Sequence, residues 1–102
     1  MPSVPEALQR LDREITGARQ KNSCFLKIIH GYGSTGKGGR LRKATLGLLD
    51  QMKTSGAIKD FVIGEQWSKF ELRTLMLIEK MPQLYKDQDL ERYNRGITIV
   101  FL

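Results

Sequence analysis

The chain has 102 residues, of which 40% are hydrophobic and 27% are charged, a composition that fits one folded domain over residues 1–102. A membrane-spanning protein is excluded, because no apolar run approaches the ~20 residues that cross a bilayer. The N-terminus also lacks the basic and apolar segments of a secretory signal. With one histidine and one cysteine, we expect no metal site and no internal disulfide. Cys24 lies in an apolar run, so we expect a buried thiol and a cytoplasmic location.

Positive charge exceeds negative charge, with 17 Lys and Arg against 11 Asp and Glu and a net charge of +6. A surplus of this sign favours polyanionic partners through the summed electrostatic field and through counterion release. The distribution of charge is more informative than its total. One stretch of seven residues holds four cations and no acid, namely Lys37, Arg40, Arg42 and Lys43.

The first predicted element is a helix that begins after Ser3. Ser3 and Glu6 form a capping pattern, and Pro5 lies in the first turn, where its missing N–H does no harm. Apolar residues then recur at helical spacing over residues 4–18. The sequence therefore predicts an amphipathic helix with one buried stripe.

A strand and a second helix follow. Residues 25–29 are apolar except for Lys27 and are too short for a helix, so we expect a central strand that is covered on both faces. Residues 38–54 place apolar side chains on one helical face and charged side chains on the other. Gly56 is expected to end that helix.

A third helix is predicted in the second half of the chain. A capping box from Ser68 to Glu71 begins it and Pro82 ends it, and we expect the apolar stripe over residues 70–81 to belong to the core. Residues 87–94 are polar, and one helical turn is expected there.

Two further strands are predicted, over residues 58–63 and 97–102, so helices and strands alternate along the chain. The strand–helix–strand unit in the middle implies two parallel strands joined by a crossover. In open parallel sheets, ligands meet the carboxyl ends of the strands. The glycine-rich residues after the first strand and residues 64–67 after the second are therefore expected at one edge of the sheet.

Residues 31–39 form what we call the glycine loop. Glycine permits positive φ and close approach of a ligand, and a loop that leads into a helix N-terminus presents free N–H groups at the positive end of the helix dipole. Lys37 and Arg40 stand at that positive end, where a cation is unfavourable unless an anion binds. We expect this region to bind the phosphates of a nucleic acid, with contacts from Gly31, Tyr32, Gly33, Ser34, Thr35, Gly36, Lys37, Gly38, Gly39, Arg40, Arg42 and Lys43.

Two other phosphate-binding patterns overlap the glycine loop and stay open. The spacing Gly-x-Gly-x-x-Gly from Gly31 matches a dinucleotide fingerprint, but the acid near the end of the next strand is only Glu65. Residues 31–37 nearly match a P-loop, but Gly38 stands where a Ser or Thr hydroxyl usually holds Mg²⁺. A phosphate- or nucleotide-binding module is therefore the alternative to a nucleic-acid-binding domain.

His30 and Tyr32 stand at the start of the glycine loop. The side chain of His30 could act as a general base, because the pKa of histidine lies near neutrality. The alternative is a strand-end histidine that is hydrogen-bonded to the backbone. Tyr32 could stack on a base or sugar or pack against the protein. Trp67 is expected in the core, and Glu65 is expected in solvent or in an ion pair.

Three segments of the chain resemble the Smr (small MutS-related) family. Residues 26–33, Leu-Lys-Ile-Ile-His-Gly-Tyr-Gly, resemble the central strand and glycine motif of that family. Residues 96–102, Gly-Ile-Thr-Ile-Val-Phe-Leu, resemble its last strand, and residues 4–11 resemble its opening helix. The resemblance implies an α/β fold, a two-layer α/β sandwich with a small mixed sheet, similar to the C-terminal domain of translation initiation factor three. Residues 67–95 look like an insertion into that fold.

The resemblance also implies a function, since Smr family members bind nucleic acid and some nick DNA or cleave RNA. The family's Leu-Asp-Leu-His-Gly-like strand before the first helix has no counterpart here, so either the true start lies upstream or this variant lacks the strand. Whether the chain is an endonuclease with His30 in the reaction stays open. No cofactor is expected, apart from a divalent cation such as Mg²⁺ in the nuclease case. The missing strand would leave a sheet edge that invites a partner strand or a second copy, so a protein-interaction module is a further alternative.

Overall fold

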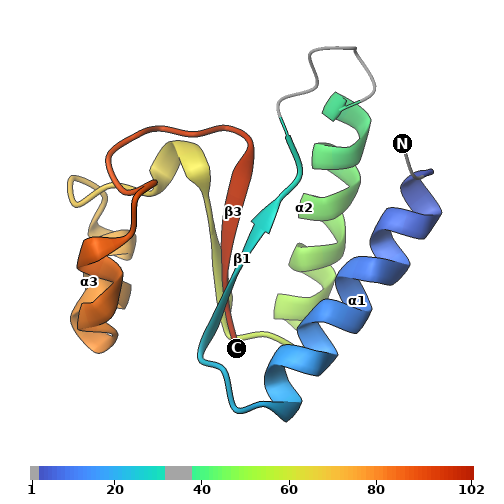
Figure 1. Cartoon of the computed structure of the whole chain (residues 1–102), viewed down its shortest axis with the longest axis horizontal. Coiled ribbons are helices and arrows are strands. Elements are labelled where there is room, and N and C mark those ends of the chain that lie inside the picture. The colour runs from blue at the N-terminus through green and yellow to red at the C-terminus, as the bar shows by residue number, and fades with distance from the viewer. Residues whose placement is uncertain (1–2, 32–37) are drawn as a thin grey trace.

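The computed structural model describes residues 3–31 and 38–102. Two helices pack on one face of a three-stranded sheet, and residues 64–96 cover the other face (Figure 1). No helix in these two ranges is long and apolar enough to cross a membrane. The elements in chain order are α1 (Val4–Gln20), β1 (Phe25–Ile29), α2 (Gly38–Ser55), β2 (Asp60–Ile63), the short 3₁₀ helix η1 (Gly64–Gln66), α3 (Leu72–Lys80), the 3₁₀ helix η2 (Pro82–Lys86) and β3 (Ile97–Phe101).

The two long helices follow their sequence signals. The hydroxyl oxygen of Ser3 accepts a hydrogen bond from the Glu6 N–H at 3.3 Å, which confirms the predicted N-terminal cap of α1. Leu11 and Ile15 are buried on its apolar stripe. At the end of α2, Gly56 has φ +82°, the left-handed conformation in which glycine commonly stops a helix.

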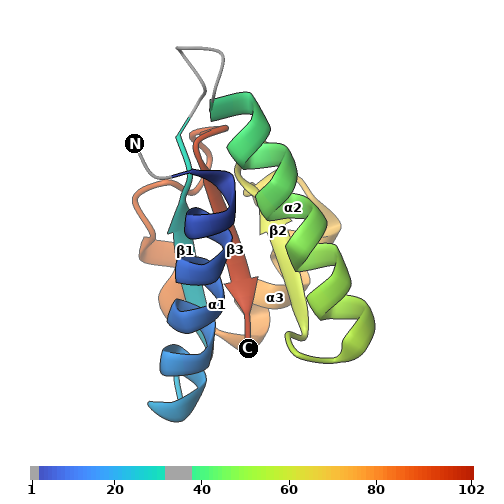
Figure 2. The same cartoon turned by 90° about the vertical axis from the view of Figure 1, so that its right-hand side faces the viewer.

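The sheet has the order β1-β3-β2, and both neighbouring pairs are antiparallel. Because β1 and β2 both run opposite to β3, they run in the same direction, as the strand–helix–strand pattern predicts. They do not touch, since the last strand of the chain lies between them (Figure 2). The sheet is therefore antiparallel throughout. The prediction of a mixed sheet is wrong, because β3 lies between the two strands that run in the same direction.

The central position of β3 explains its burial on both faces. Ile97, Ile99 and Phe101 pack into a cluster with Val62, Trp67 and residues of the 64–96 segment. Val100, from the alternate position, packs with α1 and α2 in a second cluster. All five residues of β3 are buried, so the two-layer arrangement gains a further layer from residues 64–96. Trp67 lies in the core, as predicted, with 0% of its surface exposed.

The prediction that residues 25–29 form a central strand is wrong, because β1 lies at the edge of the sheet. Its apolar pattern arises because the helices cover Leu26 and Ile28 while Phe25 packs against the opposite cluster. Ile29 is 79% exposed, and Cys24 is exposed rather than buried. An edge strand with cover on both faces carries the same apolar run as a central strand, so composition alone does not separate the two.

The predicted capping box at residues 68–71 does not form, and α3 begins later, at Leu72. The Ser68 oxygen accepts from the Phe70 N–H at 3.1 Å, and its hydroxyl donates to Glu91 Oε2 at 2.8 Å. The predicted apolar stripe is core only in part, since Ile78 is buried but Phe70 and Met76 are 89% and 54% exposed. Two further boundaries shift, because β2 begins at Asp60 rather than at residue 58 and residues 88–93 form turns rather than a helical turn.

Candidate functional site

The loop ends of all three strands gather at one end of the sheet. Ile29 pairs with Ile97 at the end of β1, and Ile63 pairs with Thr98 at the end of β2. The residues that follow β1 and β2 and those that precede β3 therefore lie together, beside the N-terminus of α2 (Figure 1). This register confirms the predicted shared edge for Gly31 and residues 64–67, whereas residues 32–37 of the glycine loop lie outside the described residues.

The carbonyl of Gly96 holds the start of the glycine loop. It accepts hydrogen bonds from the backbone N–H of His30 at 2.9 Å and of Gly31 at 3.1 Å. Gly31 has φ +78°, a conformation that a residue with a Cβ adopts only with strain. The chain can leave β1 in this direction because position 31 is a glycine.

His30 is 8% exposed and both of its ring nitrogens are engaged. Nδ1 lies 3.1 Å from the carbonyl oxygen of Gly31, and Nε2 lies 3.0 Å from the hydroxyl of Thr98. A carbonyl oxygen only accepts, so Nδ1 carries the proton and Nε2 accepts from the Thr98 hydroxyl. The ring is thus a neutral bridge between the loop and the central strand, which is the structural alternative to a free general base.

The charges around His30 favour this neutral form. Burial lowers the pKa of His30 below its usual value, the hydrogen bond to the Gly31 carbonyl opposes that shift, and the charge of Arg42 adds to it. The carboxylate of Glu65 acts in the opposite direction with a smaller effect. His30 is consequently unprotonated at neutral pH, so it adds no positive charge to the site.

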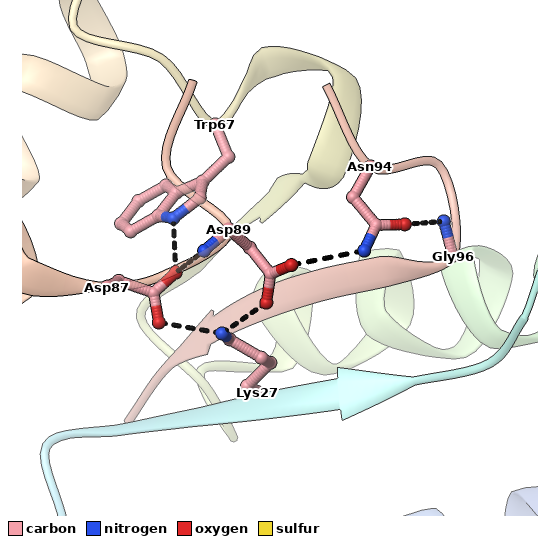
Figure 3. Close-up of polar contacts among 6 residues, drawn as sticks. All are labelled: Lys27, Trp67, Asp87, Asp89, Asn94 and Gly96. Carbon is pink, nitrogen blue, oxygen red and sulfur yellow. Dashed lines mark hydrogen bonds and ion pairs between the residues drawn. The ribbon is translucent and has the colours of Figure 1, made fainter. Parts of the chain in front are cut away.

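A partly buried polar network links β1 to the turn before β3 (Figure 3). Lys27 Nζ lies 2.6 Å from Asp87 Oδ1 and 2.5 Å from Asp89 Oδ2, and the indole of Trp67 donates to Asp87 Oδ2 at 3.0 Å. Asn94 continues the network by donating to Asp89 Oδ1 at 3.1 Å. The network fastens residues 87–94 onto β1.

The same network fixes the carbonyl that holds His30. Asn94 Oδ1 accepts from the Gly96 N–H at 2.8 Å, so the contacts that begin at Lys27 end at the residue that anchors the glycine loop. Burial alone lowers the pKa of Lys27, but the hydrogen bonds that its ammonium donates to Asp87 and Asp89 raise it above its ordinary value. The ammonium therefore stays charged and paired on the face of the sheet.

Gly64, the first residue after β2, has no room for a side chain. A Cβ at this position would lie 1.6 Å from the backbone oxygen of Asn94. The close approach brings the end of β2 against the turn that precedes β3. A glycine is required at this position for steric reasons.

Two cations converge on one acid at this end of the sheet. Arg42 Nη2 lies 2.6 Å from Glu65 Oε2, and Arg95 Nε lies 3.8 Å from the same oxygen. Within the described residues, Arg42 Nε and Glu65 Oε1 are buried without a hydrogen-bond partner. Arg42 is thus partly neutralised, as the ion-pairing interpretation of Glu65 predicts, whereas Arg95 is 69% exposed. Sequence reasoning missed Arg95, although its place just before Gly96 and β3 puts it at the shared edge.

The N-terminus of α2 carries further positive charge. Its first turn contains no acidic residue, and Gly39, Arg40 and Lys43 are all exposed. The first N–H groups of a helix have no partner within the helix, so a helix N-terminus is a place where anions commonly bind. Six of the residues predicted to bind nucleic acid lie outside the described residues, namely Tyr32, Gly33, Ser34, Thr35, Gly36 and Lys37.

The described residues at this end of the sheet include four cations, Arg40, Arg42, Lys43 and Arg95, and one acid, Glu65. Over residues 3–31 and 38–102, no group of three or more His, Cys, Asp or Glu side chains could hold a metal ion.

The model of the Smr domain family matches residues 2–68, which is about two thirds of the chain. The match ends where the 67–95 segment begins. No curated protein and no solved structure matches the chain.

Proposed function

Because the chain belongs to the Smr domain family, a nucleic-acid-binding and endonuclease-related family, we propose that it binds nucleic acid through phosphates at the loop end of its sheet. The contacts would come from the backbone N–H groups of Gly38 and Gly39 and from the side chains of Arg40 and Lys43, because the Gly31 N–H already donates to the Gly96 carbonyl. From the sequence, we also expect Tyr32 and Lys37 to contact the nucleic acid at this site.

The observation that carries the proposal is the convergence of cations on a helix N-terminus. An anion is the favoured neighbour at the start of a helix, yet the first turn of α2 holds Arg40 and no acid. Arg95 approaches from the turn before β3 and shares Glu65 with Arg42. One carboxylate among these three arginines leaves a positive surplus that a phosphate group would neutralise.

The recognition expected here is of the backbone rather than of bases. N–H groups and arginines at phosphates fix position without reading sequence. Affinity should therefore depend little on base sequence and strongly on salt, with log K falling by about 0.9 per phosphate contact for each decade of salt on duplex DNA.

The test is a pair of binding titrations at 50 and 200 mM salt, using a labelled 20-base-pair DNA duplex and a single-stranded RNA of equal length. The double variant Lys37→Ala/Arg40→Ala is compared with the unchanged chain. We expect at least tenfold weaker binding at 50 mM salt and a salt slope smaller by about 2, as two lost phosphate contacts require.

A matched control carries the same change of charge elsewhere. Arg19 and Lys21 are exposed at the far end of α1, so Arg19→Ala/Lys21→Ala should alter affinity by less than threefold. Equal loss in the two double variants would mean that only the net charge matters. Equal affinity of Lys37→Ala/Arg40→Ala and the unchanged chain would refute the proposed site.

Cleavage is a separate question from binding. The two engaged ring nitrogens of His30 favour a positioning role over that of a general base. Incubation of supercoiled plasmid with the chain and Mg²⁺, against His30→Gln, tests this directly. Nicking that disappears in His30→Gln while duplex affinity is kept would assign a catalytic role to the ring.

A further inference from the structure

The turn before β3 exposes an aromatic ring between two arginines. Arg92 and Arg95 are exposed, and Tyr93, which lies between them, is 56% exposed. Asn94 separates Tyr93 from Arg95 and is held by the hydrogen bond that it donates to Asp89 at 3.1 Å. The ring therefore leaves the surface from a backbone that the polar network anchors.

The fold itself gives no reason for a tyrosine at this position. The backbone of Tyr93 has φ +53°, a conformation that glycine and asparagine adopt more readily than a bulky residue. Among the described residues, neighbouring aromatic rings are found at Trp67 and Phe101 and not at Tyr93. Unfavourable backbone conformations of this kind concentrate at binding sites, so the exposed ring is suited to contact a ligand.

A second exposed aromatic residue, Phe70, lies on the segment beside this turn and is 89% exposed. Glu91 ties the two segments together. Its N–H donates to the Trp67 carbonyl at 3.0 Å, and its Oε1 accepts from the Lys69 N–H at 2.8 Å. Phe70 and Tyr93 consequently both lie within two residues of one anchor.

Cations surround the two rings. Lys69 precedes the phenylalanine, Arg92 and Arg95 flank the tyrosine, and all three cations are exposed. One acid beside them, Glu71, is exposed as well, while both carboxylate oxygens of Glu91 accept hydrogen bonds within the protein. Exposed rings among cations bind single-stranded nucleic acids, because bases stack on the rings and phosphates pair with the cations.

We call five exposed residues the stacking platform, namely Lys69, Phe70, Arg92, Tyr93 and Arg95. All five follow residue 68, where the match to the family model ends, so membership of the family does not account for them. The platform adjoins the proposed phosphate site, since Arg95 approaches the same carboxylate oxygen of Glu65 that Arg42 of α2 contacts. The turn before β3 and the start of α2 lie at the same end of the sheet (Figure 1).

We propose that the stacking platform binds unpaired bases, so that a single-stranded nucleic acid is the preferred ligand of this chain. The inference rests on the proposed function and adds a substrate class to it. A strand whose phosphates bind at the start of α2 continues over the turn before β3 and places bases on Tyr93 and Phe70. In a duplex, the faces of the bases are already stacked and cannot reach these rings. Every base has a flat face, so the stacking reads no sequence.

The test compares binding of the full chain to a 20-nucleotide oligothymidylate and to a DNA duplex of equal length. Tyr93→Leu keeps an apolar side chain but removes the ring, so affinity for the single strand should fall at least fivefold. Affinity for the duplex should change by less than twofold. Tyr93→Phe keeps the ring and should bind both ligands within twofold of the unchanged chain.

A strand of abasic sites provides the matched ligand, because it keeps the phosphates and lacks the bases. The unchanged chain should bind it at least fivefold more weakly than oligothymidylate, and Tyr93→Leu should bind it as the unchanged chain does. An equal loss on the abasic strand and on oligothymidylate in Tyr93→Leu would show that the ring does not act through bases, which would overturn the proposal.

The chain also offers a matched tyrosine. Tyr85 is 47% exposed on η2, which begins beside Met81, a residue that lines a groove with Cys24 and Leu102 at the opposite end of the sheet. Tyr85→Leu should alter affinity for the single strand by less than 1.5-fold, whereas Phe70→Leu should lower it at least threefold. Equal effects at positions 85 and 93 would contradict the platform.

The variants of the phosphate site separate the failures of the two proposals. Lys37→Ala/Arg40→Ala should weaken binding of both ligands, whereas Tyr93→Leu should weaken binding of the single strand alone. If only the first variant loses affinity, the phosphate site stands and the stacking platform is overturned, which leaves its rings to a protein partner. If only Tyr93→Leu loses affinity for the single strand, the platform stands and the phosphate site is refuted.

Discussion

The hydroxyl of Thr98 donates to Nε2 of His30 across 3.0 Å, in the buried space between the central strand and the start of the glycine loop. Thr98 is 0% exposed, so the imidazole is held by a group that solvent does not reach. A protonated ring could not accept this hydrogen bond, because Nε2 would then carry a proton. The contact therefore couples the charge of one side chain to the anchoring of the loop.

This coupling predicts that the protein loses stability in mild acid. Burial lowers the pKa of folded His30, while unfolded histidine titrates near about 6.5, so the unfolded state binds more protons between those two values. The stabilisation is complete above about pH 6.5 and is lost as the pH falls toward the folded pKa. Urea midpoints measured at pH 7.5, 6.5, 5.5 and 5.0 should decline, whereas those of His30→Gln should stay nearly level.

Other groups act outside that window. The Lys27 hydrogen bond lowers the pKa of Asp89, and hydrogen bonds from the Lys69 N–H and Ser68 lower that of Glu91. Their contributions are therefore present above the ordinary pKa and disappear only in stronger acid. The raised pKa of Lys27 affects stability only in strong alkali. If the urea midpoint of His30→Gln falls equally steeply between pH 7.5 and 5.0, the loss of stability does not depend on His30.

The network around Lys27 predicts a large cost when its cation is removed. Lys27→Met leaves Asp87 and Asp89 facing each other with little access to water, because their side chains are only 16% and 17% exposed. Breaking a mostly buried pair by removing one partner costs about 2–4 kcal/mol, and urea denaturation would measure it. The variant Arg10→Met breaks an exposed pair with Glu14 and should cost less than about 1 kcal/mol.

A double-mutant cycle separates the network from the loss of packing. If Lys27→Met and Asp89→Asn act through one contact, the double variant should lose less stability than the sum of the single variants by about 1 kcal/mol or more. Additive losses would show that the two side chains stabilise the fold independently.

Local signals predicted the elements whose stability is local. α1 has its cap within its own first turn, and α2 ends at a glycine with positive φ, so periodicity and capping residues were sufficient. The start of α3 was missed because the Ser68 oxygen accepts from the Phe70 N–H rather than from Glu71, while its hydroxyl donates to Glu91, 23 residues away in the chain. A capping pattern in the sequence does not reveal that a distant carboxylate binds the same serine.

The order of the strands in the sheet also could not be predicted from the sequence. Both β1 and β3 read as apolar runs, and only the antiparallel insertion of the last strand makes β3 central and β1 an edge. The shared end of the sheet was predicted correctly, since it follows from the common direction of β1 and β2. Arg95 was missed because its position depends on where β3 enters the sheet. The predictions for residues 32–37 lie outside the described residues and remain predictions.

The close approach at Gly64 predicts that alanine is not tolerated there. The added Cβ would meet the backbone oxygen of Asn94 at 1.6 Å, and neither backbone can withdraw without disturbing the ends of β2 and β3. Gly64→Ala should lower the free energy of unfolding by about 3 kcal/mol or more, the range of strained or overpacked sites. Thermal and urea denaturation would measure the loss.

The control for this substitution is a glycine with open space. Gly47 lies inside α2, and a Cβ there meets nothing within 4 Å. Gly47→Ala should therefore raise stability by about 0.5–1 kcal/mol, because alanine loses less backbone entropy in a helix. Loss of stability at position 47, or none at position 64, would contradict the steric argument.

The shared carboxylate of Glu65 predicts a variant with tighter nucleic-acid binding. Glu65→Gln keeps an oxygen that can accept from Arg42 but removes the negative charge that faces Arg42 and Arg95. The positive surplus at the proposed phosphate site rises by one charge, so affinity for a 20-base-pair duplex should increase about threefold or more at 50 mM salt. At 300 mM salt, where screening is strong, the affinity should approach that of the unchanged chain.

The control is Glu79→Gln, which makes the same change of charge at an exposed position on α3, away from the site. It should alter affinity by less than 1.5-fold, because a distant charge is screened. Tighter binding in Glu79→Gln that equals that in Glu65→Gln would assign the effect to net charge and would leave the loop end of the sheet without a special role.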